Sequence, residues 1–245
     1  LRQDDYAAAQ ELLGAAIEGF RANGNQARMA EAMVDLADVY FEQVEYAEAN
    51  ATLQHAEALY AAQQQPAGLA AVRCRQALIA YFERDLSGAE RLCRDGLALL
   101  DQRNDEIVRS RTLRLLTDIA LVQKELERAG DHLRQANEAN RTIGDQTETA
   151  AILFAQAKLD HHHGYHAEAL VSAQQSAAIY AAMGDRKARL VLNHMISRLY
   201  QKLGKRNDAR QAAQESLDMA IELGDETMQA ICADQLASTQ VMAAE

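Results

Sequence analysis

The chain has 245 residues, a formal net charge of −11 and a hydrophobic fraction of 49%. Such an acidic surface repels phosphate backbones, which argues against nucleic acid as a direct ligand. The sequence has no apolar run of about 18 residues, so we expect no transmembrane helix. The cysteines Cys74, Cys93 and Cys232 are odd in number and far apart, which favours free thiols and a cytoplasmic location.

The sequence is predicted to be helical throughout. The chain has a single proline, Pro66, and because proline breaks helix interiors, this scarcity favours helices joined by short turns. Apolar residues recur at helical spacing, for example at Leu192, Ile196, Leu199 and Leu203, and we find no alternating strand pattern. The predicted helices cover residues 3–23, 26–43, 46–63, 67–84, 87–102, 105–123, 126–143, 146–163, 166–183, 186–203, 206–223 and 226–243. We therefore predict an all-α fold of about twelve antiparallel helices.

An alanine recurs at intervals of 40 residues along the whole chain. These alanines are Ala9, Ala49, Ala89, Ala129, Ala169 and Ala209. Fifteen residues after each one stands a residue that marks a helix end, namely Gly24, Gln64, Asn104, Gly144, Gly184 and Gly224. Glycine and asparagine suit this place because they tolerate the left-handed backbone conformation. A fixed period of this length is the signature of a helical-repeat protein.

Polar residues that start helices follow most of these breaks. They are Asn25, Asp105, Asp145, Asp185 and Asp225. Two pairs have the spacing of a capping box, Asp145 with Glu148 and Ser87 with Glu90. The pattern of starts and ends divides each period into two helices.

Residues 30–59 resemble the tetratricopeptide repeat. That repeat has a large residue, leucine, a small residue and tyrosine along its first helix, here Met33, Leu36, Ala37 and Tyr40. Its second helix has aromatic, small, large and small residues, here Tyr46, Ala49, Leu53 and Ala56. The resemblance implies a right-handed α-solenoid of about six helix pairs. Small residues would lie where helices cross, on the first helices at Ala37, Ala77, Thr117, Ala157, Ser197 and Ala237.

The 40-residue unit is longer than the usual repeat of about 34 residues. It resembles the units of MalT-type activators, Rap-like receptors, Leu-Gly-Asn repeat adaptors and the repeats preceding GGDEF-type cyclases. We expect residues 1–245 to form a single repeat domain of a bacterial protein. The chain opens on a second helix and closes on a first helix with apolar Val241, Met242 and Ala243. We therefore expect a fragment of a longer chain, for which end-to-end self-association is plausible.

One cluster could carry metal chemistry: Asp160, His161, His162, His163 and His166. Imidazole and carboxylate groups are good zinc or nickel ligands, and His162 with His166 and Asp160 with His163 have helical spacing. The alternative, which we favour, is a polar helix end with histidines near the C-terminal dipole. No phosphate-binding loop, nucleophile motif or zinc-protease motif is present in the sequence. We expect no metal, no cofactor and no catalytic residue.

The resemblance implies that partners bind along fixed positions of the first helices. Carried over by position, the groove residues are Asp38, Phe41, Cys74, Leu78, Tyr81, Phe82, Arg111, Arg114, Asp118, Phe154, Lys158, His161, His194, Arg198 and Lys202. From the N-terminal to the C-terminal repeats, these predicted groove residues are first acidic, then apolar and aromatic, and finally basic. The alternative for Leu78, Tyr81 and Phe82 is that they pack between helices, because a small rotation of a helix exchanges core for groove.

These features predict a non-catalytic module that binds a protein or peptide segment within a larger bacterial regulatory protein. The bound segment would be amphipathic, with an apolar centre and acidic groups toward Arg198 and Lys202. The alternative is a sensory domain that binds a small ligand or signalling peptide and controls an attached diguanylate cyclase or transcription activator. A metalloenzyme at the histidine cluster is the least favoured interpretation.

Overall fold

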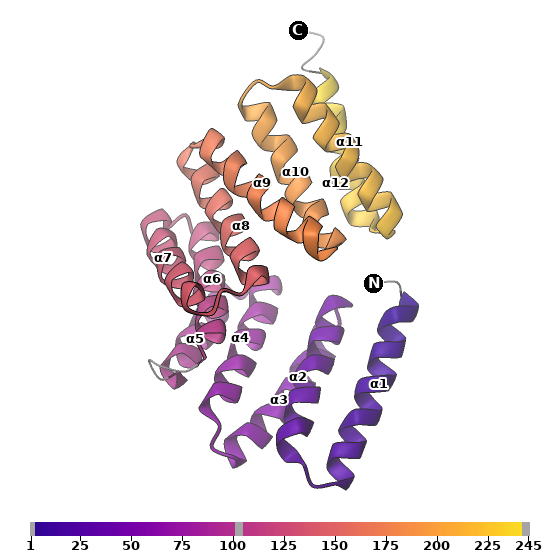
Figure 1. Ribbon diagram of the computed structural model, residues 1–245, viewed down its shortest axis with the longest axis vertical. Helices are drawn as coiled ribbons and strands as arrows, with labels where there is room; N and C mark the ends of the chain where they lie inside the picture. The colour runs from indigo at the N-terminus through magenta and orange to yellow at the C-terminus, as the bar shows by residue number, and fades with distance from the viewer. Residues whose placement is uncertain (1–2, 101–104, 242–245) are drawn as a thin grey trace. The chain divides into compact units, whose positions relative to one another are not determined.

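The computed structural model describes residues 3–100 and 105–241, and these residues form an all-α fold (Figure 1). The helices of the described residues are α1 (Gln3–Ala22), α2 (Gln26–Glu42), α3 (Tyr46–Ala62), α4 (Pro66–Phe82), α5 (Leu86–Leu99), α6 (Glu106–Val122), α7 (Leu126–Ile143), α8 (Gln146–His163), α9 (His166–Met183), α10 (Arg186–Lys202), α11 (Arg206–Leu223) and α12 (Glu226–Val241). Their bounds agree with the predicted ones to within about three residues. The predicted helix ends at 101–102 and 242–243 lie outside the described residues.

The chain divides into two compact units, Leu1–Ile119 and Ala120–Glu245, and we describe each by itself. In the first unit each helix from α1 to α5 packs on the next, and α2 also contacts α4. In the second unit each helix from α7 to α12 packs on the next, and α10 also contacts α12. The even-numbered helices are the first helices of the repeat pairs. Sequential packing of neighbouring helices is the arrangement that a helical-repeat solenoid requires.

The small residues spaced 40 apart lie where helices cross, as predicted. Ala49, Ala89, Ala129, Ala169 and Ala209 have no exposed surface. On the first helices, Ala37, Ala77, Thr117, Ala157 and Ser197 are at most 1% exposed. The two outermost members differ, because Ala9 is half-buried and Ala237 is exposed. Among the described helices α1 packs only on α2, and α12 only on α10 and α11, so these two alanines lack a covering helix.

The predicted helix ends have the left-handed conformation. Gly24, Gln64, Gly144, Gly184 and Gly224 have φ between 53° and 73°. Asn104 lies outside the described residues, and Asp105, which was predicted to start a helix, itself has a φ of 68°. Left-handed residues also join the two helices within each pair, at Val44, Arg84, Lys124, Gly164 and Gly204. Each pair is therefore closed by a turn of only a few residues.

Most of the predicted helix starters cap their helices. The side chains of Asn25, Asp145, Asp185 and Asp225 accept hydrogen bonds from backbone N–H groups three residues later. The capping box predicted for Ser87 and Glu90 is wrong, because α5 begins at Leu86 and its N-cap is Asp85. The Asp85 carboxylate accepts from the Gly88 N–H and the Ser87 hydroxyl, both at 2.9 Å. No helix that the structure describes has the length and apolar character to cross a membrane.

Val44 offers a test of the turn geometry. It has a φ of 65°, whereas Gly204 holds the equivalent place with a φ of 72°. A β-branched residue is strained in the left-handed region, at a cost of about 1–2 kcal/mol. We expect Val44→Gly to raise the free energy of unfolding by about 1 kcal/mol, measured by urea denaturation, because the relief exceeds the entropy that glycine adds to the unfolded chain. Gly204→Val should lower it by a similar amount, and equal stabilities for all three proteins would contradict this account.

Candidate functional site

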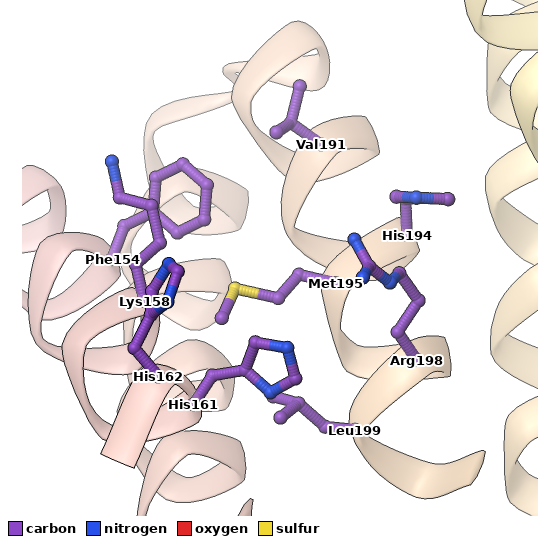
Figure 2. Close-up of a pocket in the computed structure, with 9 residues that line it drawn as sticks. All are labelled: Phe154, Lys158, His161, His162, Val191, His194, Met195, Arg198 and Leu199. Carbon is purple, nitrogen blue, oxygen red and sulfur yellow. The ribbon is translucent and has the colours of Figure 1, made fainter. Parts of the chain in front are cut away.

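A pocket with a volume of about 430 Å³ lies between α8 and α10 of the second unit (Figure 2). Both helices are first helices, which the sequence predicted to carry the groove residues. The pocket is lined by Phe154, Lys158, His161, His162, Val191, His194, Met195, Arg198 and Leu199. We call it the α8–α10 pocket. The predicted groove residues Phe154, Lys158, His161, His194 and Arg198 are therefore brought together.

The 40-residue repeat explains why these side chains meet. Phe154 and Lys158 of α8 hold the same repeat positions as His194 and Arg198 of α10. Residues four apart share one face of a helix, so each helix contributes a matching row of side chains to the same pocket. His161 extends the row on α8 by almost one further turn.

The α8–α10 pocket combines an apolar floor with a cationic rim. Leu199 is fully buried, and Met195 extends from α10 toward α8 (Figure 2). The Lys158 ammonium lies 4.8 Å from the centroid of the Phe154 ring, a cation–π contact, and Arg198 is exposed. None of the nine described lining residues carries a carboxylate. This arrangement suits an anionic group attached to an apolar body.

Two histidines of the pocket lie in a positive environment. Burial lowers the pKa of His161 below its ordinary value of 6.5, and His166 and Arg198 lower this pKa further. Burial and then Arg198 likewise lower the pKa of His194. The buried Nδ1 atom of His194 has no hydrogen-bond partner among the described residues. Lys202, a predicted groove residue, lies exposed outside the pocket lining, but its charge also lowers the pKa of His161.

The histidine cluster is arranged differently from either spacing noted in the sequence. The Nδ1 atoms of His161 and His166 lie 3.3 Å apart, whereas His163 stacks on the neighbouring tyrosine ring at a centroid distance of 5.6 Å. Asp160 accepts a hydrogen bond of 2.8 Å from Gln156. Among the side chains that the structure describes, no three His, Cys, Asp or Glu residues converge as metal ligands. The His161–His166 pair links the end of α8 to the start of α9.

The lowered pKa values predict how stability depends on pH. Well above pH 6.5, His161 and His194 are neutral in both the folded and the unfolded chain. As the pH falls through 6.5, the unfolded chain binds protons first, so stability falls until the lower folded pKa values are passed. We expect the urea midpoint to drop between about pH 7.5 and pH 5.5, and to drop less in a His161→Gln, His194→Gln variant. The exposed His163→Gln control should follow the wild type; equal slopes in all three proteins would contradict the assignment.

In the first unit, Asp38 is held by an arginine that the sequence analysis missed. Arg75 of α4 donates from Nε and Nη2 to the two carboxylate oxygens of Asp38 of α2, at 2.8 and 2.9 Å. The space bounded by these two residues, Phe41 and Leu78 has a volume of only about 10 Å³. Asp38 therefore joins two neighbouring first helices, and its carboxylate is already bound within the protein.

The predicted groove aromatics of the first unit form a cluster. Phe82 packs against Phe41 and Tyr81, with ring centroids 5.3 and 5.6 Å apart. Tyr46 at the start of α3 joins them, 5.6 Å from Phe41, although the sequence analysis assigned it only to the repeat pattern. Phe82 keeps 50% of its surface exposed. The cluster thus packs the ends of α2 and α4 together and leaves one apolar edge open.

The remaining predicted groove residues lie on α4 and α6. Cys74 hydrogen-bonds with Thr112, and burial raises the pKa of its thiol. A protonated thiol is a poor nucleophile, so Cys74 is unsuited to covalent chemistry. Arg111 and Arg114 are half-buried on α6, close enough to influence the Cys74 thiol, and Asp118 is half-buried one turn further along.

No protein-family model matches the sequence, and no curated protein matches it. Solved structures do resemble the fold. The tetratricopeptide repeat sensor protein of the Signal Transduction ATPase with Numerous Domains class from Pyrococcus horikoshii superposes over 99% of this chain, with a TM-score of 0.69 and 16% identity. This chain spans only 38% of that protein's length.

A Rap protein complexed with Competence and Sporulation Factor also superposes over 99% of this chain, with a TM-score of 0.69 and 15% identity, and 89% of that chain is covered. Pseudomonas aeruginosa pilF matches 89% of this chain and 91% of its own, with a TM-score of 0.57 and 17% identity. At these identities the likeness shows the fold. The chain therefore has the tetratricopeptide-type helical-repeat fold, as the sequence predicted.

Proposed function

We propose that this chain is a non-catalytic interaction module, and that the α8–α10 pocket binds a segment of another protein or a peptide. The observation that carries the proposal is the chemistry of this pocket: an apolar floor of Phe154, Met195 and Leu199 beneath the cations of Lys158 and Arg198. Tetratricopeptide-type folds serve many functions, so the pocket and not the fold supports the assignment.

The bound segment carries an acidic side chain beside an apolar one. A volume of about 430 Å³ lies within the range of pockets that enclose small ligands, which is room for a few side chains. The apolar side chain would cover Met195, and the carboxylate would pair with Arg198 or Lys158. The Rap protein was solved in complex with Competence and Sporulation Factor, which is consistent with a binding role for a chain of this fold.

A second candidate is sensing. The Pyrococcus horikoshii protein contains a tetratricopeptide repeat sensor within a longer chain, and this chain spans 38% of its length. In this version of the proposal, peptide binding in the cytoplasm of a bacterium shifts the arrangement of the helices and thereby controls an attached effector. Effector activity of the full-length protein, measured with and without the bound peptide, distinguishes the two functions. A change on peptide binding supports sensing, whereas an unchanged activity supports binding alone.

The experiment for the binding proposal is selection from a displayed library of random peptides. We expect the enriched peptides to combine Asp or Glu with a leucine or aromatic residue. The same selection on a Lys158→Glu, Arg198→Glu variant, shown by circular dichroism to be folded, should not enrich these peptides. Enrichment of basic peptides, or equal enrichment by both proteins, would reject the α8–α10 pocket as the binding site.

A further inference from the structure

We infer that the α8–α10 pocket binds an anionic group together with a proton, which is taken up by His161 or His194. The inference uses the pocket of the proposed function, but it does not require the ligand to be a peptide. The ligand class is an anion joined to an apolar body, such as a carboxylate or sulfonate on a hydrocarbon or aromatic group. Binding at this site would then tighten as the pH falls.

The geometry of the pocket supplies the first argument. Lys158, His161 and His162 come from α8, whereas His194 and Arg198 come from α10 (Figure 2). His161, His194 and Arg198 are basic groups around one hollow, and the described lining contains no carboxylate. An anion that enters the pocket therefore supplies a negative charge beside the two imidazoles and Arg198.

The groups that face His161 come from three helices. His162 belongs to α8, His166 to α9, and Arg198 and Lys202 to α10, and each of them disfavours a positive charge on His161. Asp160, the nearest acid in sequence, is hydrogen-bonded to Gln156.

The groups around His194 lead to the same conclusion. Arg198 is the charge that acts on it, one turn further along α10. From α12, the amide of Gln235 and the hydroxyl of Ser238 bond to Gln201 of α10, and these groups are uncharged. The buried Nδ1 of His194 has no hydrogen-bond partner among the described residues. Burial lowers the pKa of His194 most and Arg198 lowers it further, so an anion bound beside Arg198 and the imidazole favours protonation of His194.

These contacts define a coupling between ligand and proton. In the empty pocket, burial and then the neighbouring positive groups hold the pKa values of His161 and His194 below 6.5, so both imidazoles are mostly neutral near pH 7. A bound anion beside them favours the charged imidazole and raises both pKa values, so a proton from the buffer follows the anion. Where one proton is bound with each ligand, affinity rises up to about tenfold for each unit of falling pH.

The test uses the dye anilinonaphthalene sulfonate, which joins an aromatic body to a sulfonate that stays ionised throughout the pH range. Its fluorescence gives the dissociation constant for wild-type protein between about pH 7.5 and pH 5.5, with circular dichroism to show that the protein remains folded. We expect binding to tighten by about fivefold or more over this range. Titration calorimetry in two buffers of different ionisation enthalpy counts the protons taken up, and we expect close to one per dye near pH 6.

Two variants make the test specific. A His161→Gln, His194→Gln variant keeps hydrogen-bonding side chains but cannot be protonated, and its affinity should change by less than about twofold over the same range. His163→Gln alters an exposed histidine outside the pocket and should behave as the wild type. If the dye binds but no peptide is ever selected, the inference stands and the peptide proposal falls. A pH dependence that is absent in the wild type, or that persists in the double variant, overturns the inference.

Discussion

Replacing Ala169 by leucine is expected to lower the free energy of unfolding by about 2–3 kcal/mol. Ala169 has no exposed surface and belongs to a core cluster with Ala150, Ala157 and Ala173. These side chains are small because helices cross closely at this point. Three extra carbon atoms would force α8 and α9 apart or force side chains into poor rotamers. Urea denaturation followed by far-ultraviolet circular dichroism measures the change.

The control for this prediction is Ala167→Leu, two residues earlier on the same helix. Ala167 is exposed, so the substitution adds the same atoms without filling a crossing. Its effect should remain within about 0.5 kcal/mol, as is usual for surface changes. Equal effects of the two leucines would show that α8 and α9 do not cross at Ala169.

Reversing the charges of Lys158 and Arg198 is expected to weaken binding of the selected acidic peptide by about a hundredfold. Hydrogen bonds to charged groups contribute about 1.5–3 kcal/mol each, which corresponds to about tenfold or more for each cation. The change should act mainly on the association rate and on the salt dependence of binding, because the two cations lie on the rim of the pocket. Fluorescence anisotropy of a labelled peptide provides the affinities of Lys158→Glu, Arg198→Glu and the double variant.

Arg210→Glu is the matched control for these variants. Arg210 lies exposed on α11 and is not part of the pocket lining, so its reversal changes the net charge by the same amount as one pocket variant. It should alter affinity by no more than about twofold at physiological salt, because distant surface charges are screened. A loss equal to that of Arg198→Glu would mean that overall charge, and not the α8–α10 pocket, governs binding.

The sequence was sufficient to predict the helices and the crossing points. The same residue pattern recurs in each 40-residue period. Left-handed Gly144 and buried Ala129 can therefore each be recognised from the residues at the same position in the other periods. It was not sufficient in α1 and α12, where Ala9 and Ala237 follow the pattern but are only half-buried and exposed, respectively, since no further described helix covers them. Burial depends on what packs against a residue, which the period alone does not specify.

The binding site was predictable only in part. Matching repeat positions placed Phe154, Lys158 and Arg198 on one face, and the structure brings them into one pocket. The groove residues predicted from the sequence did not include Met195, because the pattern assigns an apolar residue next to the groove positions to the hydrophobic core. They also left Arg75 out, because its bidentate pairing depends on side-chain geometry across two helices and not on the repeat spacing.

The most direct test of the binding site is methyl NMR of protein labelled at the methionine methyl groups. Met195 extends into the α8–α10 pocket, whereas Met183 is exposed at the end of α9 and Met33 is buried in the first unit. On titration with an acidic peptide from the selection, we expect the Met195 resonance to shift with occupancy while those of Met183 and Met33 remain in place. A bound peptide that leaves Met195 unchanged would contradict the assignment of the pocket.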